Sequence, residues 1–82
     1  MTPYFTKRIQ TFNGCINFYF NRIYTAEGIR YHVSCMDIRR KTHAFSMVEM
    51  LGQWIVAHNC KCPTWIKNLE KDLEQAILES IS

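Results

Sequence analysis

The fold is decided by residues 4–38, which read YFTKRIQTFNGCINFYFNRIYTAEGIRYHVSCMDI. Polar and apolar side chains alternate through three runs in this stretch, and turn-forming residues separate the runs at Asn13-Gly14 and at Thr25–Gly28. Alternation with a period of two is typical of strands that bury one face and expose the other. The stretch therefore predicts a three-stranded antiparallel meander over residues 4–12, 15–24 and 29–38.

The turn at Asn13-Gly14 is expected to set the register, because both residues tolerate the positive φ that a type I′ turn requires. It predicts three cross-strand pairs: Phe12 with Cys15, Ile9 with Phe18, and Arg8 with Tyr19. With a four-residue loop at the second turn, the apolar side of the sheet carries Phe5, Ile9, Ile16, Phe18, Phe20, Tyr24, Ile29, Tyr31, Val33 and Cys35. The polar side carries Thr6, Arg8, Gln10, Asn17, Tyr19, Asn21, Arg30, His32 and Ser34.

A C-terminal helix is predicted over residues 63–80. Apolar residues recur there at steps of three and four, and the stripe consists of Ile66, Leu69, Leu73, Ala76 and Ile77, beside Trp65. Pro63 suits the first helical turn, where its missing N–H is no loss. Because the stripe needs an apolar surface to cover, we expect the helix to pack on the apolar side of the meander.

Residues 43–59 permit two interpretations. They form either one amphipathic helix or a hairpin, in which strands 43–50 and 54–59 flank a turn at Leu51-Gly52-Gln53. Gly52 and several β-forming side chains favour the hairpin. The predicted fold is therefore α+β, a two-layer, five-stranded antiparallel meander with one C-terminal helix packed on its apolar face, in a single domain of residues 1–82. The alternative is three strands followed by two helices.

The second half of the chain carries a pattern that resembles other proteins. Over residues 43–80 the pattern reads Phe45-x-Met47, Gly52-x-Trp54-x-Val56 and Pro63-x-Trp65-Ile66-x-x-Leu69-Glu70-x-x-Leu73-x-x-Ala76-Ile77. It resembles that of small uncharacterised α+β proteins common in Bacteroidetes. The resemblance implies a hairpin in the middle, a helix at the end and a bacterial source, and it brings no activity with it.

The composition bounds the class of protein. A chain of 82 residues that is 48% hydrophobic and 21% charged predicts one globular domain, because disordered chains are less hydrophobic and carry more net charge. No apolar run reaches the roughly 18–20 residues that cross a bilayer, and Met1–Arg8 lacks the features of a signal sequence. We therefore expect a cytoplasmic protein that does not associate with membranes.

The net charge of +3 is unevenly distributed along the chain. Residues 1–41 hold seven Lys or Arg against two carboxylates, a net +5, whereas residues 42–82 hold three against five, a net −2. A basic sheet attracts phosphate groups or acidic proteins. Lys and Arg also keep the edges of ordinary sheets soluble, so the charge alone leaves both explanations open.

Four cysteines, Cys15, Cys35, Cys60 and Cys62, are expected to be reduced thiols. Cys60-Lys61-Cys62 suggests a zinc site, to which Cys15, Cys35, His43 or His58 would have to add the remaining ligands. Paired zinc ligands are usually separated by two to four residues, so a separation of one gives weak support. We expect no cofactor.

Catalytic motifs do not occur in the sequence. It has no Gly-rich phosphate loop, nucleophile elbow or metalloprotease motif. Glu70 and Glu74 share one side of the predicted helix, where they are expected to be solvated surface residues. We therefore expect no enzymatic activity.

Two non-enzymatic functions are left. The first is a protein-interaction or self-associating module, in particular a homodimer, which would cover Tyr4, Phe12, Tyr19 and Ile23 on the free face of the sheet. The second is single-stranded nucleic-acid binding by stacking and phosphate contacts. The candidate partner surface for both is the patch Arg8, Tyr19, Arg30 and His32. The modest charge and the lack of an RNA-binding motif rank protein interaction first, and a small zinc-binding module with Cys60 and Cys62 is a third alternative.

Overall fold

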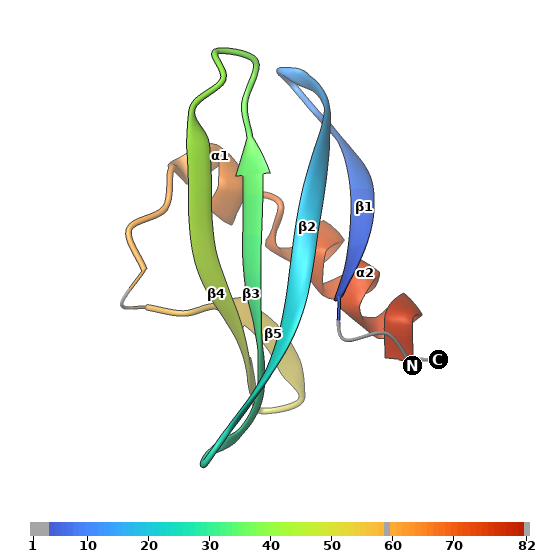
Figure 1. The fold of residues 1–82 in the computed structure, drawn as a ribbon, viewed down its shortest axis with the longest axis vertical. Coiled ribbons are helices and arrows are strands. Elements are labelled where there is room, and N and C mark those ends of the chain that lie inside the picture. The colour runs from blue at the N-terminus through green and yellow to red at the C-terminus, as the bar shows by residue number, and fades with distance from the viewer. Residues whose placement is uncertain (1–3, 59, 82) are drawn as a thin grey trace.

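In the computed structural model, which describes residues 4–58 and 60–81, a five-stranded antiparallel sheet carries two helices on one side (Figure 1). The strands lie in sequence order and are β1 (Tyr4–Thr11), β2 (Gly14–Thr25), β3 (Gly28–Met36), β4 (Thr42–Met50) and β5 (Gln53–Val56). The helices are α1 (Thr64–Lys67) and α2 (Glu70–Ile81). Of the predicted domain of residues 1–82, residues 1–3, 59 and 82 lie outside the described residues, and so does the last residue of the expected strand 54–59.

The predicted meander with a C-terminal helix is confirmed, but its sheet is curled rather than a flat layer. Strand twist accumulates along the strands, of which β2 has 12 residues, and it brings β5 behind the lower part of the sheet (Figure 1). The curl lets β5 contact α2 while β1 contacts the same helix from the other edge. One short helix can therefore span the concave side of five strands.

The buried core occupies the side of the sheet that the alternation predicted to be apolar. Its sheet residues are Ile9, Ile16, Phe18, Phe20, Tyr31, Val33, Cys35, Phe45, Met47, Trp54 and Val56. From the helices, Ile66, Leu73, Ala76 and Ile77 complete it. Aromatic rings pack closely at one end, where Phe5 stacks on Phe20 at 4.5 Å between centroids and Tyr31 meets Trp54 edge-on at 5.2 Å. Such contacts add to the stability that burial itself provides.

The first hairpin has a different register from the predicted one. Thr11 pairs with Gly14, so that Ile9 lies opposite Ile16 and Arg8 opposite Asn17, and the loop is Phe12-Asn13. The predicted pairs of Phe12 with Cys15, Ile9 with Phe18 and Arg8 with Tyr19 are therefore wrong. The side chain of Thr11 explains the difference, because its hydroxyl accepts a hydrogen bond from the Asn13 N–H (3.0 Å) and donates one to the Gly14 carbonyl (2.8 Å).

The register error left the two faces of the sheet correct. The pairing is displaced by two residues, and an even displacement keeps every side chain on its own face. The second hairpin uses the same device, since Thr25 pairs with Gly28 and the Thr25 hydroxyl donates a 2.8 Å hydrogen bond to the Gly28 carbonyl. The motif Thr-x-x-Gly thus closes both hairpins, and the second loop has two residues rather than the expected four.

Replacing Gly14 with valine should lower the free energy of unfolding by about 1 kcal/mol or more. Gly14 has φ 99°, which a β-branched residue rarely adopts, and no atom lies within 4 Å of an added Cβ. The cost is therefore conformational rather than steric. Urea denaturation followed by circular dichroism measures it, with Asn17→Val at an exposed position of β2 as the control. A Gly14→Val variant as stable as that control would contradict the turn.

The middle of the chain is the predicted hairpin and not a helix. Met50 pairs with Gln53 across the two-residue turn Leu51-Gly52, in which φ is 54° and 81°, as a type I′ turn requires. The turn is shorter than expected because Gln53 already belongs to β5. Leu51 is 98% exposed and occupies a conformation that favours Asn or Gly.

The predicted helix over residues 63–80 is interrupted after one turn. Asn68 and Leu69 separate α1 from α2, and the Leu69 N–H bonds to the carbonyl of Ile66, three residues back rather than four. The apolar stripe continues across this tightened turn: Ile66, Leu73, Ala76 and Ile77 are buried, whereas Trp65 and Leu69 are half-buried.

Candidate interaction surface

The four residues predicted as a partner surface all lie on the side of the sheet opposite the helices. The four residues lie in different rows of the sheet, where a row is a set of residues directly opposite one another on neighbouring strands. Arg8 lies opposite Asn17, Tyr19 opposite Thr6 and Ser34, His32 opposite Asn21 and Ser46, and Arg30 opposite Ile23 and Val48. Successive rows are about 7 Å apart along a strand, so the rows of Arg8 and Arg30 are separated by about 20 Å. The four residues form a diagonal stripe across the open face, not a compact cluster.

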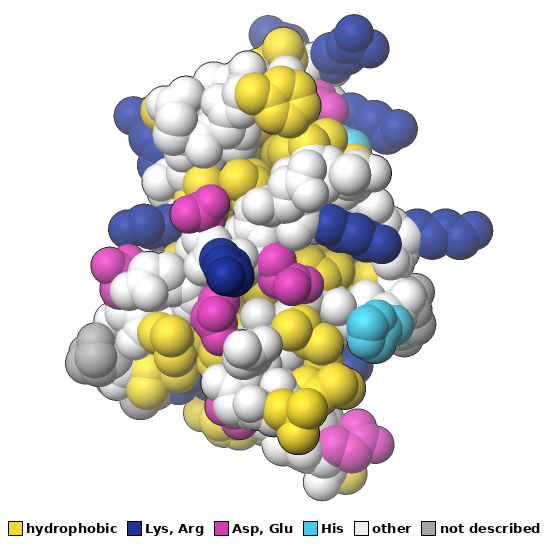
Figure 2. Space-filling model, turned by 180° about the vertical axis from the view of Figure 1, so that it is seen from behind, with side chains coloured by type: hydrophobic (Ala, Val, Ile, Leu, Met, Phe, Trp, Pro, Cys, Tyr) yellow, Lys and Arg dark blue, Asp and Glu magenta, His cyan; other side chains and the backbone are white. Residues whose placement is uncertain are grey.

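This open face exposes apolar side chains, as expected for a single chain. Tyr4 is 67% exposed and Tyr19 52%, and Ile23 and the turn residue Phe12 are exposed as well. No strand position that points to the open face in the described residues carries Asp or Glu. The carboxylates of α2 gather on the other side, which Figure 2 shows from the helix side. The open face is therefore basic and aromatic.

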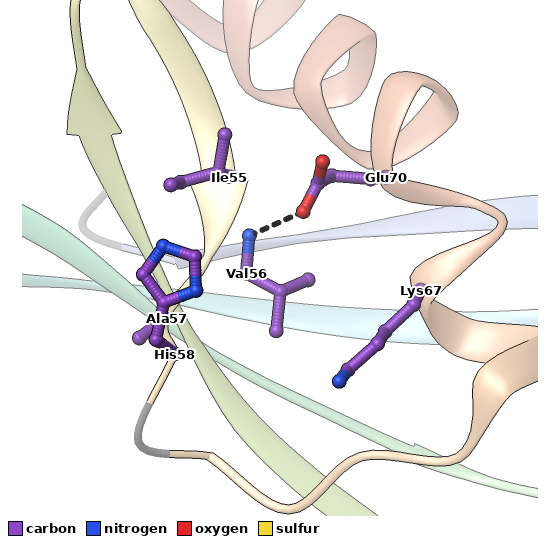
Figure 3. Close-up of a pocket in the computed structure, with 6 residues that line it drawn as sticks. All are labelled: Ile55, Val56, Ala57, His58, Lys67 and Glu70. Carbon is purple, nitrogen blue, oxygen red and sulfur yellow. Dashed lines mark hydrogen bonds between the residues drawn. The ribbon is translucent and has the colours of Figure 1, made fainter.

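The two edges of the sheet differ in their protection. At the β5 edge, the backbone N–H of Val56 donates to Oε2 of Glu70 (2.8 Å, Figure 3) and the N–H of Trp54 donates to Oε2 of Glu74 (2.9 Å). Both glutamates are half-buried. The expectation that they are solvated surface residues is wrong, because two carboxylates one helical turn apart match two outward N–H groups of a strand.

Among the residues that the structure describes, the β1 edge has no such protection. In an antiparallel ladder, hydrogen-bonded pairs alternate with pairs that are not hydrogen-bonded. The pair next to a two-residue hairpin loop is hydrogen-bonded, so it determines which residues of the strand direct their backbone groups outward. The alternation correctly assigns the outward N–H groups of β5 to Trp54 and Val56, which are the groups bonded to glutamate. Counted from the pair Thr11 and Gly14, it assigns the outward backbone groups of β1 to Tyr4, Thr6, Arg8 and Gln10. The described residues supply no hydrogen-bond partner for these four N–H groups.

A groove of about 290 Å³ runs between β1 and α2, beside the free edge. Lys7, Arg8 and Gln10 line it from the strand, and Asp72, Gln75 and Glu79 line it from the helix. The Lys7 Nζ lies 3.2 Å from Oε1 of Glu79, and both side chains are about half exposed. Such an exposed ion pair adds little stability. It connects the side chains of the strand and the helix and leaves the backbone edge of β1 uncovered.

A hollow with a volume of about 400 Å³ lies near the other edge (Figure 3). His58 and Lys67 border it, but Glu70, the carboxylate in its wall, already accepts the Val56 N–H. An acid–base pair requires a carboxylate that is available to a substrate. In the described lining, Glu70 is therefore engaged by the strand, and His58 and Lys67 are the other polar side chains at the rim.

The cysteines do not assemble a metal centre in the described part of the chain. None of the four forms a disulfide, and no group of three or more described Cys, His, Asp or Glu side chains lies close enough to hold a metal ion. Burial raises the pKa of Cys62, and it raises that of Cys35 to about 11. Cys60 accepts a hydrogen bond from the Ser46 N–H at 3.3 Å. The Cys60 and Cys62 pair thus gains no third ligand among the described residues.

Asp37 organises the turn between β3 and β4. Its Oδ1 accepts hydrogen bonds from the backbone N–H groups of Arg39 and Lys41, both at 2.9 Å, and its Oδ2 lies 3.0 Å from Nε2 of His43. Cys35 lies opposite His43 in the ladder, so a thiol, an imidazole and a carboxylate are neighbours. A nucleophilic site requires an accessible thiolate, whereas Cys35 is 2% exposed and protonated. The cluster is therefore structural.

Acidification should destabilise the protein partly through Asp37. The hydrogen bond to His43, followed by those from the Lys41 and Arg39 backbone, lowers the pKa of Asp37 in the folded state. Its stabilisation is therefore complete above the unfolded pKa of about 3.9 and is lost as the pH falls through the lower folded value. Urea midpoints at pH 7 and pH 3 measure this loss, which should be smaller in Asp37→Asn than in the wild type. Equal losses in both proteins would contradict the assignment.

No known family model, curated protein or solved structure matches this chain. The resemblance of residues 43–80 to small proteins of Bacteroidetes thus stays a prediction. Neither described helix combines the length and the apolar character of a membrane-spanning segment.

Proposed function

We propose that this protein is an interaction module that takes up an additional extended strand at the edge of β1. The observation that carries the proposal is the difference between the two edges: Glu70 and Glu74 occupy the outward N–H groups of β5, while those of Tyr4, Thr6, Arg8 and Gln10 have no partner among residues 4–58 and 60–81. Proteins block edges that must stay unpaired. When one edge of a sheet is blocked and the opposite edge is open, the open edge is available for strand addition. Backbone hydrogen bonds then give affinity, and side chains give specificity.

The side chains next to the free edge suit a partner strand. Thr6 and Arg8 project to the open face at the edge itself, and Tyr19 lies beside Thr6 on β2. Arg30 and His32 lie on β3, farther from this edge. Of the four residues of the candidate partner surface, Arg8 and Tyr19 belong to the proposed site, and the other two lie beyond it.

An NMR titration tests the proposal. The probe is an extended peptide of alternating threonine and glutamate, whose carboxylates all project to one face and complement Arg8 when that face is the open one. The backbone amide signals of Thr6, Arg8 and Gln10 should shift on titration, and those of Trp54 and Val56 at the blocked edge should not. Thr6→Pro should abolish the shifts, because proline removes an outward N–H that the β1–β2 ladder does not use. If the peptide shifts neither edge and the protein alone shows no concentration-dependent shifts in β1, strand addition is excluded.

A second candidate function is single-stranded nucleic-acid binding on the open face. It is favoured by one observation, that this face carries Arg8, Arg30, Tyr19 and Tyr4 without a carboxylate among its described positions. Bases stack on exposed aromatic rings while cations contact phosphates. Against it, the rows of Arg8 and Arg30 are far apart.

Fluorescence anisotropy with a mixed-sequence oligonucleotide tests this second function. Affinity should fall as salt is raised, because phosphate contacts release counterions. Replacing both Tyr19 and Arg30 with alanine should then weaken binding at least about tenfold, since one stacked base contributes about 1–3 kcal/mol. Lys71→Ala on the exposed side of α2 is the matched loss of charge and should have little effect. A double variant that binds as the wild type does would remove this candidate.

A further inference from the structure

We infer that the strand taken up by β1 is β1 of a second copy of this chain, paired antiparallel about a two-fold axis at Thr6. The inference rests on the proposed function and names its partner. Antiparallel pairing of identical strands is the arrangement that a two-fold axis generates, and it presents the same edge on both subunits. It would join two five-stranded sheets into one continuous sheet with Glu70 and Glu74 blocking both outer ends.

The charges of β1 select the register. An axis at Lys7 places Lys7 opposite its own copy, and an axis at Arg8 does the same for Arg8, which is unfavourable because like charges then lie directly opposite. An axis at Ile9 runs the partner of Thr6 past the end of β1 at Thr11. An axis at Phe5 leaves Arg8 without a partner within β1.

The axis at Thr6 avoids all these conflicts. It pairs Thr6 with its own copy, and it places Arg8 of each subunit opposite Tyr4 of the other, where a guanidinium can lie over an aromatic ring. Lys7 then lies opposite Phe5 on the concave side. All three pairs of outward residues, those formed by Tyr4, Thr6 and Arg8, fall at hydrogen-bonding positions.

The open faces also meet favourably at this axis. Tyr19 is the direct neighbour of Thr6, so the row across the junction would run Tyr19, Thr6 and then the same two residues of the second copy in reverse. The two half-exposed Tyr19 rings would flank the paired threonines and cover apolar surface that one chain leaves in water. Because strand pairing buries less area than a standard interface, the dimer should be weak.

Size-exclusion chromatography with light scattering, over a concentration series up to about 1 mM, tests the inference. The wild type should approach twice the mass of one chain as the concentration rises. Thr6→Pro should raise the dissociation constant about tenfold or more, since it removes two hydrogen bonds at the axis. Thr6→Val keeps the N–H and should dimerise. Circular dichroism verifies that both variants are folded.

A charge exchange tests the register itself. Tyr4→Arg should abolish the dimer, because it would place two cations opposite each other at both ends of the junction. Adding Arg8→Glu to Tyr4→Arg should restore the dimer through opposite charges, which happens only if positions 4 and 8 are partners. Neither residue is buried in one chain, so both variants should fold.

The outcomes separate the inference from the proposed function. A wild type that stays monomeric overturns the inference, while peptide-induced shifts in β1 would still support strand addition. A dimer that Thr6→Pro leaves intact overturns the inference, because the copies would then meet at another surface. A dimer that the charge exchange does not restore overturns the pairing at Thr6.

Discussion

Replacing Leu73 with alanine should lower the free energy of unfolding by about 2–5 kcal/mol. Leu73 is completely buried, and it lies at the centre of the contact between α2 and the sheet, with Ile66 and Ile77 on either side in the stripe. Truncation removes buried methyl groups and leaves a cavity that the surrounding strands cannot fill. Because small domains have little stability in reserve, much of the population should unfold near room temperature.

Urea denaturation followed by the circular dichroism of the helix measures this loss. Lys71→Ala is the matched control, since Lys71 is exposed on the same helix two residues away. Its effect should stay within about 0.5 kcal/mol. Equal stability of Leu73→Ala and Lys71→Ala would mean that α2 docks through another face. Glu74, on the same helix, is unsuitable as a control because it accepts the Trp54 N–H.

Removing both Glu70 and Glu74 should expose the second edge of the sheet. Each carboxylate accepts a backbone N–H of β5, and leaving such a partly buried donor without a partner costs about 1–3 kcal/mol. The double alanine variant should therefore be less stable than the wild type by about 2–6 kcal/mol. It should also aggregate more readily, because an unblocked strand pairs with other chains.

Glutamine at both positions separates the hydrogen bond from the charge. Glu70→Gln with Glu74→Gln keeps an acceptor oxygen, although a neutral acceptor forms a weaker bond than a carboxylate. We expect its loss of stability to be less than half that of the alanine variant, and we expect no aggregation. Denaturation curves and light scattering on heating measure the two effects. An alanine variant that neither loses stability nor aggregates would show that the glutamates do not protect this edge.

The register of the first hairpin marks the limit of what local sequence rules can decide. Asn-Gly is a strong turn signal, and it correctly placed a turn between β1 and β2. The hydroxyl of Thr11 instead selects the loop Phe12-Asn13, with Gly14 as the residue of positive φ. The predicted loop Asn13-Gly14 and the observed loop Phe12-Asn13 each have two residues. The hydrogen bonds of the Thr11 side chain favour the observed loop. The repeat Thr-x-x-Gly at Thr25–Gly28 is the sequence signal that would have identified it.

The candidate site was predictable in part. Alternation placed Arg8, Tyr19, Arg30 and His32 on one face, because a strand directs successive side chains to opposite sides whatever its neighbours are. Their spacing depends on the pairing of three strands, which placed them in separate rows. The alternation therefore predicted the face of the sheet but not the shape of the patch.

The sequence by itself determined the order of the elements, the two faces of the sheet and the apolar stripe of the helix. These depend on interactions between residues close in the chain and on a periodicity that each element carries alone. The tertiary structure decided which edge of the sheet is blocked and which is free. Glu70 reaches Val56, and Glu74 reaches Trp54, only because the curled sheet brings β5 against α2. Such contacts join residues 14 and 20 positions apart, and no local pattern specifies them.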